Sequence, residues 1–209
     1  MSAGATSREA WQWLETEPLL ARLDAFIAPA AASALLETLL HEVAWESPAI
    51  RVYGRDHVIP RAQCWMGDPE ASYRYSGSQL VPTAWHPAVA ELAIRVQQAL
   101  AQAELPTTEF NSVLLNRYHD GQQRMGWHSD DEPELGPDPI VAAVSLGAER
   151  PLRFRERRRG PGRRAFNVWL PHGSLLLMGP GVQSRWQHAL APRAIPGPRI
   201  SLTFRRVHG

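Results

Sequence analysis

The segment GWHSDDE, from Gly126 to Glu132, places one histidine beside a run of carboxylates. In an extended segment, residues i and i+2 point to the same face, so His128 and Asp130 can bind one cation from one side. The alternative is a solvated acidic turn, and because the chain has 8 histidines, an H-x-D pair does not decide between the two by itself.

A third ligand has to come from elsewhere in the chain. His188, in SRWQHALAP, is the best candidate because it lies between two strand-like segments. Two histidines and one carboxylate leave coordination positions open, and such a set suits non-haem Fe(II) and its reactions with O2.

The segment PRISLTFRR near the C-terminus has polar side chains at every second residue, namely Arg199, Ser201, Thr203 and Arg205. On a strand these side chains share one face. Two guanidinium groups near a metal suit a dicarboxylate, which they bind by paired hydrogen bonds. Asn116 and Tyr118, also two residues apart, are placed to donate to the same anion. The alternative is a polar strand face in solvent, which the coincidence of all these residues disfavours.

The composition predicts one globular domain. The chain has 209 residues, of which 44% are hydrophobic, enough for a proper core. Cys64 is the single cysteine, which excludes an internal disulfide and a cysteine-rich zinc site and favours a reducing cytoplasm. No apolar run reaches the ~20 residues of a membrane helix, and the N-terminus lacks the pattern of a secretory signal. No sequence feature indicates an oligomer, so we expect a monomer.

Two segments have helical spacing of apolar residues, at 29–45 and 86–103, whereas the chain after Glu109 consists of short strand-like segments separated by turn residues. We therefore predict a mainly β fold with flanking helices, an α+β chain built as a sandwich or jelly roll, with both helices outside one sheet. The first ~25 residues are the least certain part, because chain ends are commonly poorly ordered.

The segment RPLRFRERRRGPGRR, from Arg150 to Arg164, contains eight arginines and has a hairpin tip at RRRGPGRR. A solvated charged hairpin is one interpretation. A basic patch that faces phosphates is the other.

Several motifs occur in order: NRY, WHSDDE, PIVAAVSLG, HGSLLLM, WQHALAP and PRISLTFR. Together they resemble the AlkB family of Fe(II)/2-oxoglutarate-dependent nucleic-acid dealkylases, over roughly residues 50 to 207. The resemblance implies a double-stranded β-helix, the jelly-roll architecture. It also implies one dioxygenase domain over 1–209, with an N-terminal extension and helix at 1–48, a nucleotide-recognition lid at 49–82, and a helix plus catalytic core at 83–209.

The resemblance also implies roles for the site residues. His128, Asp130 and His188 match the iron ligands, which are the catalytic centre. Arg205 matches the residue that grips the distal carboxylate of 2-oxoglutarate, and the other co-substrate contacts are Asn116, Tyr118, Arg199 and Ser201. Ser201 replaces the asparagine usual in the family, and its hydroxyl can still form a hydrogen bond.

The stretch VYGRDHVIPRAQCWMGD followed by YRYSG is similar to the family's lid. There Tyr73, Tyr75 and Ser76 match the wall of the pocket for the flipped base, and Glu132 matches an acidic contact to the base edge. Tyr53 falls where double-strand-specific relatives have an aromatic wedge, and its alternative is a packed strand residue. Arg61, from the lid stretch, and Arg155, from the arginine-rich segment, complete the predicted substrate contacts.

The implied activity is oxidative demethylation of bases such as 1-methyladenine and 3-methylcytosine in single- or double-stranded DNA. Fe(II) is the bound metal, O2 and 2-oxoglutarate are consumed, and formaldehyde, succinate and CO2 are released. Such lesions are cationic near neutral pH, so Asp131 and Glu132 would favour them electrostatically. The alternatives are a hydroxylase or demethylase that acts on RNA or protein, and a non-catalytic nucleic-acid-binding jelly roll.

Overall fold

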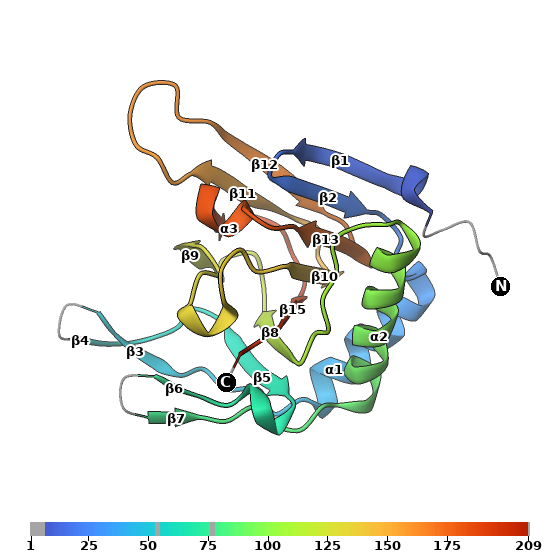
Figure 1. The fold of residues 1–209 in the computed structure, drawn as a ribbon. Helices are drawn as coiled ribbons and strands as arrows, with labels where there is room; N and C mark the ends of the chain where they lie inside the picture. Colours follow the sequence, from blue (N-terminus) through green and yellow to red (C-terminus); the bar gives the residue numbers. More distant parts are fainter. Residues whose placement is uncertain (1–6, 53–54, 76–77, 209) are drawn as a thin grey trace.

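The chain folds into two β-sheets that face each other, with two helices outside the larger one (Figure 1). The structure is a computed structural model that describes residues 7–52, 55–75 and 78–208, with side chains described outside 50–56 and 73–80. The larger sheet has seven strands, in the spatial order β1 (Trp11–Thr16), β2 (Leu19–Leu23), β13 (Ser174–Met178), β10 (Val141–Gly147), β15 (Arg199–Arg205), β8 (Ser112–Tyr118) and β5 (Ala62–Gly67).

The smaller sheet has four strands, in the order β12 (Ala165–Leu170), β11 (Arg150–Glu156), β14 (Trp186–Leu190) and β9 (Met125–His128). The short helix α3 (Val182–Arg185) leads into β14, and short 3-10 turns cover Arg8–Ala10, Pro69–Ala71 and Pro133–Leu135. The predicted jelly roll is confirmed by these two facing antiparallel sheets.

The helices α1 (Pro29–Glu42) and α2 (Pro87–Gln102) lie where the spacing of apolar residues predicts them. Both begin at a proline, which suits the first turn because its missing N–H would have no helical partner there. The His86 side chain caps α2 by accepting from the Ala88 backbone N–H at 3.2 Å. The buried faces of both helices join the outer face of the larger sheet in one apolar core.

Strand β15 has the alternation that its sequence predicts. Ile200, Leu202 and Phe204 are fully buried in the core beneath the helices. The intervening side chains, Arg199, Ser201, Thr203 and Arg205, line a pocket on the other face of the sheet, between the two sheets. The same space also holds a second apolar core, which includes Phe154, Met178 and Trp186.

The N-terminal segment differs from the expectation of poor order. Residues 11–23 form the β1–β2 hairpin, and β2 pairs antiparallel with β13, so Leu23 faces Leu175. Trp11, Leu20 and Leu23 are buried. This segment is held in place because Trp11 and Leu23 join the core beneath the helices and Leu20 joins the core between the sheets.

The range predicted as a lid contains three structural parts. β3 (Ala49–Val52) pairs with β4 (Arg55–Val58), and β6 (Tyr73–Tyr75) pairs with β7 (Ser78–Leu80). Between these hairpins, β5 belongs to the larger sheet. The segment before β3 and the segment after β7 each contact β5 through an isolated bridge, from Glu46 to Gln63 and from Thr83 to Met66. The domain boundaries at 48 and 82 stay predictions.

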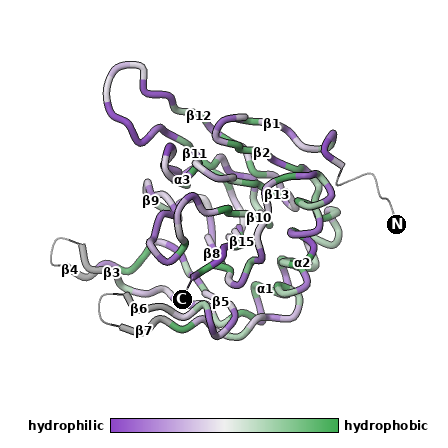
Figure 2. Tube along the Cα trace, viewed as in Figure 1, coloured by the Kyte–Doolittle hydropathy of each residue, from purple (hydrophilic) through white to green (hydrophobic). Residues whose placement is uncertain are grey.

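The hairpin at the arginine-rich segment forms as predicted. β11 and β12 are paired, and the Glu156 N–H donates to the Arg164 carbonyl at 3.0 Å where the connection begins. The connection extends away from the sheets as a hydrophilic loop (Figure 2). Among the described residues, no helix combines the length and apolarity needed to cross a membrane.

Candidate active site

The structure brings the three predicted metal ligands together. His128 ends β9 and lies directly across from His188 on β14, with ring centroids 4.2 Å apart. Candidate ligand atoms of His128, His188 and Asp130 lie within 4.8 Å of one another. Ser129, between the two ligands of the first segment, points away and donates its hydroxyl to the Trp186 carbonyl at 2.9 Å. The i and i+2 alternation inferred from the sequence therefore holds.

Hydrogen bonds fix the orientation of two of these ligands. The Gly126 carbonyl lies 2.9 Å from His128 Nδ1 and can only accept, so Nδ1 carries the proton and Nε2 is left for a metal. The Asp130 N–H donates to the Gln183 Oε1 at 3.0 Å. Gln183 is buried on α3, and it holds the backbone of the carboxylate ligand in place.

The charges of the triad suit metal binding. Burial lowers the pKa of His188 to about 3, and the neighbouring His128 adds to this effect. Burial alone would raise the pKa of Asp130, but Arg205 and the two histidines offset it, so that pKa lies below its ordinary value. A neutral imidazole and an ionised carboxylate are the forms that bind a metal ion.

Two buried polar atoms of the triad indicate that a cation fits between its side chains. Asp130 Oδ2 and His188 Nδ1 are buried and have no hydrogen-bond partner among the described residues. Buried polar atoms normally have partners, so both atoms call for a ligand that a side chain does not supply. Two histidines and one carboxylate with open positions fit Fe(II).

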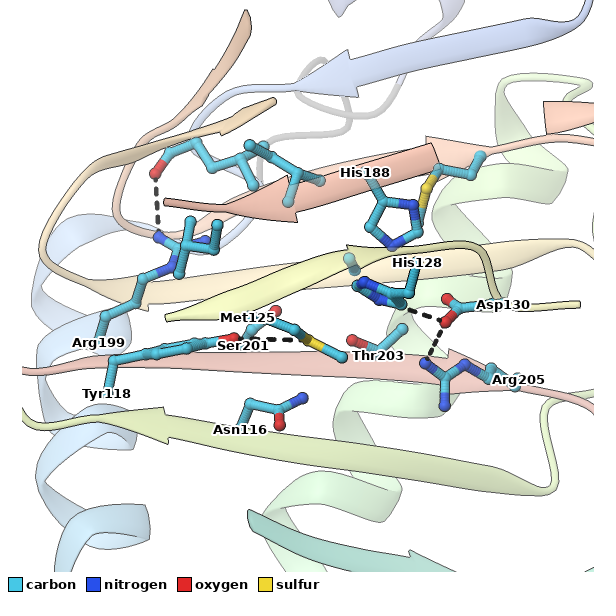
Figure 3. A pocket seen from close by; sticks show the side chains of 15 residues that line it. Asn116, Tyr118, Met125, His128, Asp130, His188, Arg199, Ser201, Thr203 and Arg205 are labelled. Carbon is cyan, nitrogen blue, oxygen red and sulfur yellow. Dashed lines mark hydrogen bonds and ion pairs between the residues drawn. The ribbon is translucent and has the colours of Figure 1, made fainter. Parts of the chain in front are cut away.

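The pocket runs from the triad to Arg199 (Figure 3). Arg199 lies opposite Tyr118 in the β15–β8 register and is 2% exposed. Its Nη2 donates to the Ser145 hydroxyl at 2.8 Å, its Nη1 donates to backbone carbonyls, and its Nε has no partner among the described residues. Burial lowers the pKa of Arg199 to about 10.

No carboxylate within the described part of the chain forms an ion pair with Arg199. A buried guanidinium group is costly unless an anion compensates it. Arg199 therefore marks the end of the pocket where an anionic group of a ligand belongs. Asn116 and Ser201 face each other across β8 and β15 and line the same pocket between the two ends.

Comparison with known proteins agrees with this geometry. The sequence profile of the 2OG-Fe(II) oxygenase superfamily matches residues 20–205. The human DNA oxidative demethylase ALKBH2 is 35% identical over 215 residues, which cover 99% of this chain and 80% of that protein. The chain belongs to the AlkB family of 2OG-Fe(II) oxygenases.

A second relative supports the assignment to the AlkB family, and a solved structure shares the fold. The human alpha-ketoglutarate-dependent dioxygenase alkB homolog 3 is 34% identical over 195 residues, 88% of this chain and 64% of that protein. The solved structure of OsALKBH1 covers 94% of this chain and 99% of its own with a TM-score of 0.67, and at 18% identity it shows the shared fold. As an AlkB-family oxygenase, the chain uses Fe(II), 2-oxoglutarate and O2.

The role predicted for Arg205 in this AlkB-family site requires a correction. Arg205 does not lie at the distal end of the pocket, because its Nη2 donates to Asp130 Oδ1 at 2.8 Å (Figure 3). It stabilises the ionised carboxylate of a metal ligand. Arg199 is the arginine at the far end, next to Tyr118, and it takes the place that the sequence interpretation gave to Arg205.

The two acidic residues after Asp130 also differ from each other. The Asp131 carboxylate forms an ion pair with Arg157 of the β11–β12 hairpin, so its charge is already compensated. Glu132 instead lines a second hollow beside the metal end of the AlkB-family site, shared with Gln63, Trp65, Glu134 and Arg205. Of the two, Glu132 is the one that lines a hollow, and its contact with a base stays a prediction.

Arg155 does not reach the pocket. Its neighbour Phe154 packs between the sheets, so Arg155 lies on the outer face of the smaller sheet. Its guanidinium group lies 4.1 Å from the centre of the Trp127 ring and donates to Gln187 Oε1 at 2.9 Å and 3.0 Å. Arg155 is therefore not among the residues that line the pocket, and its predicted contact with the substrate stays a prediction.

The remaining predicted substrate contacts fall in the range predicted as a lid. Tyr53 and Ser76 lie outside the described residues. The backbones of Tyr73 and Tyr75 are in β6, and their side chains are outside the described part. Their roles in base binding stay predictions.

The sequence interpretation missed two contacts. Gln183 comes from α3, a single turn with no strong sequence signal. Arg61 donates through Nε to Asn116 Oδ1 at 2.7 Å, so it contacts a residue that lines the pocket. The pairing of β5 with β8, which creates this contact, depends on the tertiary fold.

Proposed function

We propose that this chain is a DNA oxidative demethylase that removes N-linked methyl groups from bases of the 1-methyladenine and 3-methylcytosine type. One observation carries the proposal: a cation site with unpartnered ligand atoms and a buried arginine without a carboxylate partner, among the described residues, line the same pocket. The substrate class is supported by the 35% identity with human ALKBH2 over 99% of the chain.

His128, Asp130 and His188 hold the iron. Arg199 binds the distal carboxylate of 2-oxoglutarate, and Asn116, Tyr118 and Ser201 line the path between the two ends of the pocket. When bound, iron and 2-oxoglutarate together with O2 supply an oxidation that gives succinate and CO2 and hydroxylates the methyl group, which then leaves as formaldehyde.

The protein's residues orient the co-substrate and protect the reaction. Arg205 keeps Asp130 ionised, and burial keeps His188 neutral, so that both ligands stay in their binding forms. Leu152, Leu170, Met178 and Leu190 line the same pocket and keep bulk water away from the reacting groups.

The hollow beside the metal end is the proposed base site. Glu132 and Glu134 line it, and carboxylates there favour a cationic methylated base over a neutral one. Extruding a base from a duplex costs a few kcal/mol, and aromatic stacking at Tyr73 and Tyr75 would return ~1–3 kcal/mol per base.

The arginine-rich hairpin is the proposed contact for phosphates. Arg159 at its tip is exposed, and Arg153 and Arg155 both stack on Trp127 at the outer face of the smaller sheet. Arginine side chains fixed in this way suit phosphate oxygens. A monomer in the cytoplasm stays the prediction from the sequence.

Turnover on matched oligonucleotides tests the proposal. The protein is reconstituted with Fe(II) without O2, then mixed with 2-oxoglutarate, O2 and one sequence that carries 1-methyladenine either as DNA or as RNA. We expect unmodified adenine and formaldehyde from the DNA. Turnover restricted to the RNA would replace the proposal by the RNA alternative, and turnover of neither would contradict it.

A further inference from the structure

Arg61 and Asn116 form a hydrogen-bonded pair behind the co-substrate pocket. Arg61 immediately precedes β5, and Asn116 lies on β8, opposite Gln63 in the β5–β8 register. The Arg61 Nε donates to Asn116 Oδ1 at 2.7 Å. Asn116 is 3% exposed and Arg61 is half-buried, so water competes little for this bond.

This contact determines which way the Asn116 amide points. A guanidinium group has only donors, so the amide atom that meets it must be the carbonyl oxygen. The Nδ2 amino group is then the free end of a side chain that lines the pocket. A carboxylate in the pocket therefore meets a donor. Without Arg61 the amide can turn over and present its oxygen, which would repel the carboxylate.

The position of Arg61 separates it from the residues that touch the ligand. Asn116, Tyr118 and Arg199 line the pocket, whereas Arg61 is not among the lining residues. Burial lowers the pKa of Arg61, and the nearby Tyr118 phenol opposes this. The guanidinium remains a charged donor at neutral pH, and its bond to Asn116 is of the strong, charge-assisted kind.

We propose that Arg61 is a positioning residue for 2-oxoglutarate, and that it acts by holding the Asn116 amide with Nδ2 toward the co-substrate. The sequence interpretation placed Arg61 at the substrate base instead. The inference rests on the proposed function, because it takes 2-oxoglutarate as the occupant of the pocket.

Binding of 2-oxoglutarate to the Mn(II)-loaded protein tests this role without turnover. Calorimetric titrations are compared for the wild type, Arg61→Met, Asn116→Ala and the double variant. Loss of a hydrogen bond from a charged donor predicts that Arg61→Met raises the Kd by roughly tenfold or more. In the Asn116→Ala background, Arg61→Met should change the Kd no further, because the amide through which it acts is gone.

Two more variants complete the design. Arg61→Lys keeps a charged donor and should recover part of the lost affinity. It also keeps the test decisive if Arg61→Met does not fold, because the lysine variant should bind less tightly than the wild type. Arg124→Met is the matched control, because Arg124 is exposed and its backbone N–H donates to Pro60, next to Arg61. It removes the same charge and should leave the Kd unchanged.

Steady-state kinetics with a methylated oligonucleotide separate the two roles of Arg61. A positioning role predicts a raised KM for 2-oxoglutarate and a kcat near that of the wild type at saturating 2-oxoglutarate. An unchanged Kd for 2-oxoglutarate with a raised KM for the oligonucleotide would overturn the proposal in favour of a substrate contact. Additive effects of the two single variants would overturn it as well. If the wild type binds no 2-oxoglutarate, the proposed function itself fails, a result distinct from either outcome.

Discussion

His128 and His188 face each other across strands β9 and β14, with ring centroids 4.2 Å apart. The pairing joins two ligands that lie far apart in the sequence, and Asp130 completes the set from the segment that follows β9. The smaller sheet and the segment that follows β9 therefore supply the candidate metal ligands. The larger sheet supplies the residues proposed to face 2-oxoglutarate, so the proposed reaction takes place between the two sheets.

Metal binding should stabilise the fold through this triad. Adding Mn(II) to the metal-free protein is expected to raise the Tm, because a ligand that binds only the folded state adds to its stability. His188→Ala should lose both this shift and all turnover. Thermal unfolding with and without the metal provides the measurement. A shift of equal size in His188→Ala would place the metal elsewhere.

Substitution of Arg199 should weaken 2-oxoglutarate binding, whereas substitution of Arg205 should weaken metal binding. Arg199→Met is expected to cost roughly 2–5 kcal/mol of 2-oxoglutarate binding, the size typical of a truncated buried charge pair. Arg205→Met removes the support of a metal ligand and should lower metal affinity by about 10–100-fold. Calorimetry with each ligand distinguishes them. The assignment of the two ends of the pocket is wrong if Arg205→Met alone weakens 2-oxoglutarate binding at saturating metal.

Base selection should depend on Glu132 more than on Asp131. Glu132 lines the hollow beside the metal end, whereas Arg157 compensates Asp131. Glu132→Gln is expected to lower kcat/KM for a cationic 3-methylcytosine more than for a neutral 3-methylthymine. Asp131→Asn, which removes the same charge, should change that ratio little. A larger effect of Asp131→Asn than of Glu132→Gln would place base selection at Asp131 instead.

The arginine-rich hairpin should contribute to DNA affinity in a salt-dependent way. Replacing Arg157, Arg158 and Arg159 by alanine is expected to reduce the slope of log K against log salt by about 0.9 for each phosphate that the protein no longer neutralises. Arg95→Ala, on the exposed side of α2, serves as the control. If the slope is the same in all proteins, the hairpin is only a solvated charged loop.

The sequence predicted which side chains of a strand face the pocket, but not which end of the strand lies near the metal. The alternation on residues 199–205 placed Arg199, Ser201 and Arg205 on the pocket side, as the structure confirms. It could not say which arginine lies near the metal, because that depends on how the two sheets are aligned. The H-x-D spacing predicted two ligands of one site, since both belong to one extended segment.

Local sequence patterns could not predict the contacts between segments that are far apart in the chain. The β1–β2 hairpin is held by its pairing with β13, and Asn116 accepts a hydrogen bond from Arg61, which immediately precedes the neighbouring strand β5. Gln183 supports Asp130 from a single helical turn. Each of these relationships arises from packing between segments whose own sequences do not specify a partner.

Coupling of 2-oxoglutarate turnover to repair is the most direct test of the account. Succinate, formaldehyde and unmodified cytosine are measured in one reaction of the Fe(II)-loaded protein with 2-oxoglutarate, O2 and DNA that carries a single 3-methylcytosine. Equal amounts of all three are expected from the wild type, and none from His128→Ala. Succinate formed equally fast with unmethylated DNA, with no cytosine restored in the methylated strand, would contradict it.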